Sequence, residues 1–152
     1  MNYWLIKSEP ETYSIDDLKK DKKTYWDGVR NYQARNFMRD GMKKGDSVLF
    51  YYSNAEPSGV AGVCRVAKEG YPDFTAWDKK DRHYDSASSQ EKPVWMMVDV
   101  EFFEKFNHVV SLEELKADQK LKTMLVIKRG MRLSVQPVDK THFDEVVRLG
   151  RQ

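Results

Sequence analysis

The chain has 152 residues, of which 33% are charged and 40% hydrophobic, and its formal net charge is +2; this length predicts one domain, residues 1–152, with a sizeable core. No apolar run approaches the roughly 20 residues of a membrane helix, the first residues lack the features of a secretory signal, and the single cysteine, Cys64, excludes an internal disulfide and a multi-thiolate zinc site. These features predict a cytoplasmic protein, or a nuclear one in a eukaryote, with no membrane partner, no metal and no cofactor.

The first half of the chain predicts a strand, a short helix and a hairpin-like pair of strands. Tyr3–Ile6 is apolar and β-prone, and Pro10 follows its polar end. Ser14, with acids after it, predicts the N-cap of a helix that ends near residue 20. Residues 46–53 predict a strand and residues 60–67 its returning partner, in which Gly62 indicates a bulge or a close backbone approach.

The second half predicts a long loop, two strands and two helices. Residues 71–92 have no sustained period, which is typical of a functional or mobile loop, whereas residues 93–106 alternate as a long strand does. Ser111 begins a capping-box pattern, residues 132–138 predict a strand, and Thr141 is expected to cap a last helix. About five strands interrupted by short helices predict an α+β domain on a mixed, closed sheet, with a pocket where strand ends and inserted helices meet.

Residues 26–36 form the most informative segment. They place Trp26, Gly28, two arginines and several amides at an expected loop-to-helix junction. Gly28 allows the backbone to turn tightly or to approach a ligand, and Asn31 is a favoured N-cap. An aromatic plate, amide edges and guanidinium groups are the parts that stack a base, read its edge and hold a phosphate.

Six segments, taken in order, resemble the EVE domain family: residues 4–10, 26–36, 49–54, 71–73, 95–100 and 132–138. The resemblance covers nearly the whole chain. It implies a PUA-like fold, a small mixed β-barrel flanked by short helices, related to YTH and ASCH domains. Members of the family are regarded as readers of modified bases in DNA or RNA that accept a flipped-out base in an aromatic pocket, with 5-methylcytosine and its oxidised forms as the usual candidates. Many relatives carry a histidine where this chain has Tyr52.

The resemblance and the residues together predict a noncatalytic module that binds DNA or RNA carrying a modified base. Trp26 would stack on the base, and Ser8, Asn31 and backbone groups would read its edge, with Glu9 as an acceptor for an amino group. Arg30, Arg35 and Lys7 would contact phosphate, because a net charge of +2 provides no strong global field. The expected binding residues are Lys7, Ser8, Glu9, Trp26, Val29, Arg30, Asn31, Arg35, Asn36, Tyr51, Ser53, Ser134 and Gln136.

Each of these expectations has an alternative. Trp26 is a core residue in the simplest reading, as we expect for Trp4 and Trp95, and the two arginines would then form weak surface ion pairs with Asp27 or Asp40. An enzyme acting on modified nucleotides would use Glu9 or an aspartate as general base. Scattered histidines and the absence of a nucleophile motif argue against catalysis. A protein-interaction module docking through residues 71–84 is the third possibility.

Overall fold

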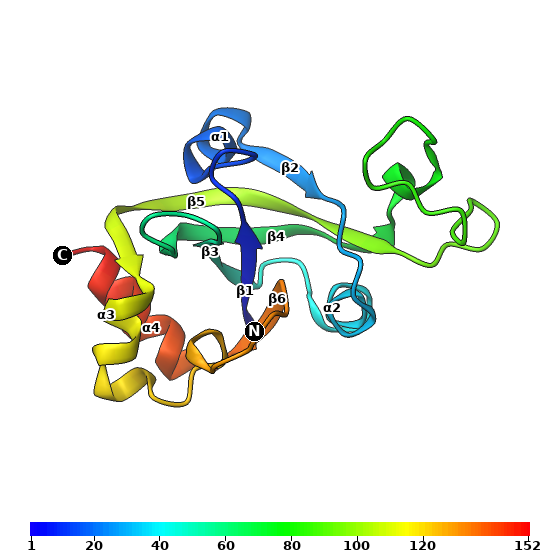
Figure 1. Cartoon of the computed structure of the whole chain (residues 1–152). Helices are drawn as coiled ribbons and strands as arrows, with labels where there is room; N and C mark the ends of the chain where they lie inside the picture. The colour runs from blue at the N-terminus through cyan, green and yellow to red at the C-terminus, as the bar shows by residue number, and fades with distance from the viewer.

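A computed structural model describes all of residues 1–152, as a six-stranded mixed sheet with four short α-helices (Figure 1). The strands are β1 (Tyr3–Ser8), β2 (Lys23–Trp26), β3 (Ser47–Tyr52), β4 (Gly59–Pro72), β5 (Met96–Ser111) and β6 (Val135–Val138). The helices are α1 (Ile15–Asp21), α2 (Tyr32–Asn36), α3 (Leu112–Ala117) and α4 (Lys140–Gly150). A π-helical turn, η1 (Phe37–Gly41), continues α2, and three 3₁₀ turns are η2 (Phe74–Trp77), η3 (Gln119–Leu121) and η4 (Leu125–Ile127).

The strand order across the sheet is β2-β5-β4-β3-β1-β6. β1 and β3 pair in parallel, and the other neighbouring strands pair antiparallel. The two edge strands, β2 and β6, are not paired with each other. β4 and β5 are the long strands, and Figure 1 shows α3 and α4 at one end of them and the segment that connects β4 to β5 projecting at the other.

The sheet is buried on both faces, because its central strands carry apolar residues at successive positions. Ile6 and Phe50 belong to a core cluster of 17 buried residues that includes residues of α1 and α2. Their strand neighbours, Leu5 and Leu49, belong to a second cluster of 13 buried residues that includes residues of α3 and α4. Successive side chains of a strand point to opposite faces, so each strand supplies both clusters. No helix has the length and apolar character needed to cross a membrane.

Local signals predicted several elements correctly. Ser14 and Asp17 form the capping box of α1, Ser111 and Glu114 form that of α3, and the Asn31 side chain caps α2 by accepting from Ala34 N–H. The ladder between β4 and β5 shifts register at Gly62, where an added Cβ would lie 2.3 Å from a backbone oxygen of β5. The bulge and the close approach predicted there are therefore both confirmed.

Four predictions about the elements were wrong. The strand expected at residues 132–138 begins only at Val135, as β6. Thr141 does not cap α4: the N-cap is Asp139, two residues earlier, because Phe143 N–H already donates to Asp139 C=O. Trp26 ends a strand, β2, rather than lying in a loop before a helix; four residues are too few for a periodic signal, and β2 is defined only by its pairing with β5. β4 continues to Pro72, past the predicted end at residue 67, because bulges keep it paired with β5.

Two tryptophans expected in the core are there. Trp4 and Trp95 are both buried, and each indole N–H donates to a carboxylate, Trp4 to Asp46 (3.0 Å) and Trp95 to Asp85 (2.7 Å). Hydrogen bonding satisfies the polar edge of each ring, which is the usual condition for burying an indole.

Candidate nucleic-acid interface

A cavity of about 800 Å³ lies between the two edges of the sheet. Its wall combines the end of β1, the end of β2 with the residues after it, the segment before β6, and part of the connection between β4 and β5. The lining residues are Lys7, Ser8, Glu9, Thr12, Tyr13, Thr24, Tyr25, Trp26, Asp27, Gly28, Val29, Ser53, Arg82, His83, Met131, Arg132 and Ser134. A volume of this size lies within the range of small-molecule and nucleotide pockets.

Trp26 forms part of the cavity wall and is half-buried. Its ring makes edge contacts with Phe50, at a centroid distance of 5.5 Å, and with Tyr13, at 6.1 Å. These contacts support the indole from the core side, and the cavity adjoins it. The purely internal position that was the alternative for Trp26 is therefore not what the structure has.

The end of β1 gives the cavity three polar side chains, Lys7, Ser8 and Glu9. The Ser8 hydroxyl donates to Tyr13 C=O (2.6 Å), which leaves its oxygen lone pairs free to accept. One carboxylate oxygen of Glu9 accepts from the Asn54 amide (2.8 Å), and the other has no partner. Hydrogen-bond acceptors of this kind suit an exocyclic amino group such as N4 of cytosine.

Lys7 carries a partly buried ammonium group. Its Nζ donates to Met131 C=O (3.3 Å) and lies 5.9 Å from the centre of the Tyr51 ring. Burial first, and the positive charge of Arg132 second, lower the pKa of Lys7 from its usual value. An anionic or carbonyl oxygen in the cavity would offset both effects, because it would interact with the charged form.

Arg82 and Arg132 are two cavity residues that the sequence analysis missed. Both side chains are exposed, and neither has a hydrogen-bond or ion-pair partner elsewhere in the chain. Arg82 lies in a segment without periodicity, and Arg132 lies in a basic run just before β6, so neither had a local signal beyond its charge. They are the free guanidinium groups of the cavity.

His83 and Gly28 lie against each other on the cavity wall. Gly28 has a left-handed backbone, with φ +79°, and an added Cβ would lie 2.5 Å from the His83 ring. His83 Nδ1 lies 3.1 Å from Asp27 Oδ2 and 3.4 Å from Asp81 Oδ1. The positive φ of Gly28 agrees with the conformational freedom expected there, but the group that lies against it is an imidazole of the same chain, and the expected approach to a ligand stays a prediction.

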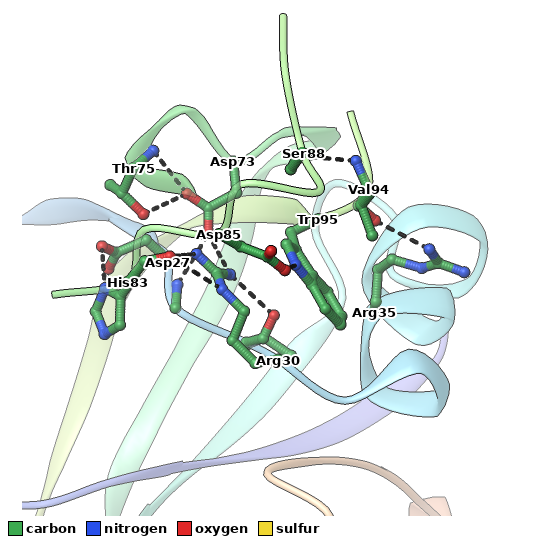
Figure 2. Close-up of polar contacts among 12 residues, drawn as sticks. Asp27, Arg30, Arg35, Asp73, Thr75, His83, Asp85, Ser88, Val94 and Trp95 are labelled. Atoms are coloured by element: carbon green, nitrogen blue, oxygen red, sulfur yellow. Dashed lines mark hydrogen bonds and ion pairs between the residues drawn. The ribbon is translucent and has the colours of Figure 1, made fainter. Parts of the chain in front are cut away.

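Arg30 does not line the cavity, because its guanidinium is used within the protein (Figure 2). It pairs with Asp73 (3.0 Å), donates to His83 C=O (2.6 and 3.2 Å) and to Val29 C=O (3.0 Å), and lies 5.4 Å from the centre of the Trp95 ring. Neither the expected phosphate contact nor an ion pair with Asp27 describes this side chain. Its partners are far away in sequence, in the segment between β4 and β5.

Asp73 anchors this network. It is fully buried and accepts from Gly28 N–H (2.9 Å), from Arg30, and from the backbone and hydroxyl of Thr75. Burial pushes the pKa of Asp73 upward, but the hydrogen bonds from Thr75, Gly28 and Arg30 outweigh it and hold the pKa below its usual value. A single carboxylate thus joins the segment after β2 to the segment after β4.

The remaining residues of α2 are also outside the cavity. Arg35 donates to Val94 C=O (2.9 Å) and to the Asn36 side chain (2.8 and 3.1 Å), and it lies 4.9 Å from the Tyr32 ring centre. Figure 2 shows Arg35 reaching Val94 from the helix. The Asn31 amide oxygen is engaged in the cap of α2. These three side chains hold the helix and the neighbouring connection together.

The remaining residues expected at the site divide into two groups. Val29, Ser53 and Ser134 line the cavity. Tyr51 is buried in the second core cluster, and Gln136 is buried with its amide donating to Leu133 C=O (2.9 Å). Tyr51 and Ser53 were expected to share a face, but β3 ends at Tyr52, so strand alternation does not extend to Ser53.

The Tyr52 phenol has a structural partner. Its hydroxyl accepts from Ile15 N–H (2.9 Å), at the first residue of α1, and the side chain is not on the cavity wall. The phenol that stands where many relatives have a histidine therefore joins β3 to α1.

Two possible reactive groups carry no assignment. Asp27, Asp81 and His83 place possible metal-ligand atoms within 4.8 Å of one another, but hydrogen bonds from the backbone and ring of His83 account for these contacts. Cys64 is buried in β4, and burial raises the pKa of its thiol, which disfavours the reactive thiolate.

Comparison with known families identifies the fold. The sequence model described as the EVE domain matches residues 2–149. The chain belongs to the EVE domain family. Human thymocyte nuclear protein 1 is 43% identical to this EVE domain over 167 residues, which cover 97% of the chain and 73% of the human protein.

Solved structures agree with this EVE domain over its whole length. A hypothetical protein from Leishmania major has a TM-score of 0.94 and 47% identity, and the match covers 99% of this chain and 94% of that one. Human thymocyte nuclear protein 1, solved in complex with DNA containing 5-methylcytosine, has a TM-score of 0.93 and 42% identity, with coverage of 100% and 99%. An ASCH protein from Zymomonas mobilis shares the fold alone, with a TM-score of 0.56 and 11% identity. The predicted α+β, PUA-like fold is confirmed, but the sheet is not closed as expected, because its edge strands β2 and β6 do not pair with each other.

Proposed function

We propose that this EVE domain is a noncatalytic module that takes one modified base of a DNA or RNA strand into the cavity between β2 and β6. The candidate base is 5-methylcytosine or one of its oxidised forms. The observation that carries the proposal is the Trp26 ring, which is supported by Phe50 and Tyr13 on the core side and adjoins a cavity of about 800 Å³. The human relative solved with 5-methylcytosine-containing DNA supports this choice of ligand.

Different polar residues of the cavity wall would contact the base and the phosphate of a nucleotide. Trp26 would stack on the base, while Ser8 and the free oxygen of Glu9 would accept hydrogen bonds from its edge. Arg82 and Arg132, rather than Arg30 and Arg35, would contact phosphate, because only the first two are on the cavity wall and unpaired. Discrimination of one methyl group by an apolar wall would contribute about 1–3 kcal/mol.

A reader is favoured over an enzyme by the state of the reactive groups. Catalysis requires an activated nucleophile or an acid and base in reach of the substrate. Cys64 is buried away from the cavity, so the one thiol of the chain is not available as a nucleophile there. A turnover assay on modified oligonucleotides separates the two functions: product formation that disappears in Glu9→Ala would replace the reader by an enzyme.

An exclusive docking role for residues 71–84 has less support, because this segment contributes Arg82 and His83 to the cavity wall. Deleting it should therefore weaken oligonucleotide binding. A deletion variant that folds and binds as tightly as the native chain would favour a separate docking function.

The proposal is tested by Trp26→Ala, with binding measured by the anisotropy of a labelled oligonucleotide. Stacking on one aromatic ring contributes about 1–3 kcal/mol per base, so we expect affinity for the 5-methylcytosine oligonucleotide to fall by roughly 5- to 100-fold, and Trp26→Phe to retain much of it. Unmodified and RNA oligonucleotides of the same sequence define the preference. If folded Trp26→Ala binds like the native protein, Trp26 does not contact the base.

A further inference from the structure

Two exposed aromatic side chains form a pair beside the cavity. Tyr25, in β2, and Phe74, the first residue of η2, are each 45% exposed, and their ring centroids lie 5.2 Å apart at an interplanar angle of 63°. Tyr25 also lines the cavity, whereas Phe74 lies beyond it. Exposed large aromatic rings that adjoin each other and a cavity mark an interaction surface.

Both rings are held by ordered backbone rather than by mobile loops. Asp73 caps η2 by accepting from Thr75 N–H, and its bonds to Gly28 and Arg30 fix the position of the turn against the end of β2. Tyr25 is opposite Asp99 in the ladder between β2 and β5. Hydrogen bonds within the chain therefore position the backbone of both rings, and a ligand does not have to order it, which lowers the entropic cost of binding.

The position of β2 at the sheet edge relates this pair to the cavity. Tyr25 and Trp26 are successive residues, so their side chains leave the strand on opposite sides. Trp26 packs against the core residue Phe50, and Tyr25 packs against exposed Phe74. A chain that passes over this edge strand meets one aromatic surface on each side of it.

We propose that Tyr25 and Phe74 form a stacking platform for the base next to the one in the cavity. The proposal rests on the proposed function, because the ligand must be a polynucleotide with one base bound beside Trp26. A flat heteroaromatic base fits two adjoining rings, and the platform is continuous with the cavity through Tyr25. Since every base has a π-face, the platform would require a neighbouring base but tolerate its identity.

The test uses two single-stranded DNA probes, each with one central 5-methylcytosine. In the first probe both neighbours of the 5-methylcytosine are normal nucleotides, and in the second both are abasic sites. Phe74→Ala should weaken binding of the first probe by roughly 5- to 100-fold, the range that stacking on one ring supports. Both proteins should bind the abasic probe equally, because it has no neighbouring base to stack.

Matched variants separate stacking from other effects. Phe103→Ala removes a ring that is 44% exposed on β5 and is not on the cavity wall, so it should bind like the native protein. Phe74→Tyr should retain binding, whereas Phe74→Leu, which keeps apolar volume without the ring, should not.

The outcomes distinguish this inference from the proposed function. If the native protein binds the first probe and Phe74→Ala binds it equally well, the platform is refuted and the reader function stands. If Phe74→Ala loses the same affinity for both probes, Phe74 affects binding without contacting a neighbouring base, and the platform is also refuted. If the native protein binds no modified probe, the reader function fails, and the platform fails with it.

Discussion

The buried carboxylate of Asp73 connects the cavity wall to the aromatic platform formed by Tyr25 and Phe74. It fixes Gly28 on one side and the turn containing Phe74 on the other, and it holds Arg30 away from the cavity. A buried carboxylate with this many donors is stabilised in its charged form. Consequently one side chain outside the cavity fixes Gly28 on the cavity wall and the turn containing Phe74 beside it.

The pH dependence of stability should reflect this carboxylate. Because the folded state holds the pKa of Asp73 below its usual value, the stabilisation is complete above the unfolded pKa of about 3.9 and is lost as pH falls through the lower folded pKa. Asp73→Asn should therefore cost about 3 kcal/mol at pH 7, and the difference from the native protein should shrink below about pH 4. Urea unfolding at a series of pH values measures both effects.

Asp40→Asn is the control for that measurement. Asp40 pairs with Arg39 at 2.9 Å, close to the 3.0 Å of Asp73 and Arg30, but the pair is exposed. Exposed pairs contribute little to stability because water screens them, so Asp40→Asn should lose much less than Asp73→Asn. Equal losses in the two variants would contradict the role assigned to burial.

A second prediction for a single residue concerns the stability of variants at Gly28. Gly28→Ala would combine a left-handed backbone with a Cβ placed 2.5 Å from the His83 ring. Gly130 has nearly the same φ, +78° against +79°, but open space around it. We expect Gly130→Ala to cost only the backbone strain of about 1–2 kcal/mol and Gly28→Ala to cost more in thermal or chemical unfolding. A loss no greater at Gly28 would mean that His83 moves aside freely.

At the scale of elements, the helices depend on side-chain caps and on bonds from the sheet. α1 and α3 have the capping boxes expected from the sequence, because such signals lie within four residues. α1 has in addition the bond from Ile15 N–H to the Tyr52 hydroxyl, which joins it to β3. Only the tertiary structure brings these two residues together.

Tyr52→Phe tests whether this phenol is structural. Removing the acceptor should cost about 1 kcal/mol in the free energy of unfolding and leave oligonucleotide binding unchanged, because Tyr52 is outside the cavity. Tyr32→Phe is the control, since the Tyr32 hydroxyl is exposed and makes no hydrogen bond within the chain. Weaker binding by stable Tyr52→Phe would instead indicate a contact with the ligand.

At the scale of the whole molecule, charge acts locally. The net charge is only +2, so attraction to nucleic acid must come from a few groups at the cavity. Arg82 and Arg132 come from segments 50 residues apart in the numbering, and the fold brings both to the cavity wall without an intramolecular partner.

The salt dependence of binding should therefore depend on these two arginines. In the double variant Arg82→Ala/Arg132→Ala, the slope of log affinity against log salt concentration should become less steep. For single-stranded DNA, its magnitude should fall by about 0.7 for each phosphate that the protein no longer neutralises. Arg39→Ala removes one guanidinium charge that is paired with Asp40 away from the cavity, and it should leave the slope unchanged. An unchanged slope in the double variant would show that phosphate is held elsewhere.

The success of sequence-based prediction followed the range of each signal. The caps of α1, α2 and α3 and the apolar run of β3 depend on neighbouring residues, and they were predicted correctly. β2 was missed because its four residues become a strand only by pairing with β5. Arg30 was expected to contact phosphate because the sequence does not show that it pairs with Asp73, 43 residues away. Arg82 was missed because it lies in a segment without periodicity, whose position in the fold the sequence does not indicate.

The amino-acid sequence by itself therefore determined the class of fold, the family, most helix caps and the presence of Trp26 in a segment suited to a base. The tertiary structure alone decided which polar groups are free. Hydrogen bonding within the folded chain occupies Arg30, Arg35 and Asn31, while the unpaired edges of the sheet leave a cavity with Arg82 and Arg132 on its wall. The physical reason is that a polar side chain is available to a ligand only if no closer partner satisfies it, and those partners come from distant parts of the sequence.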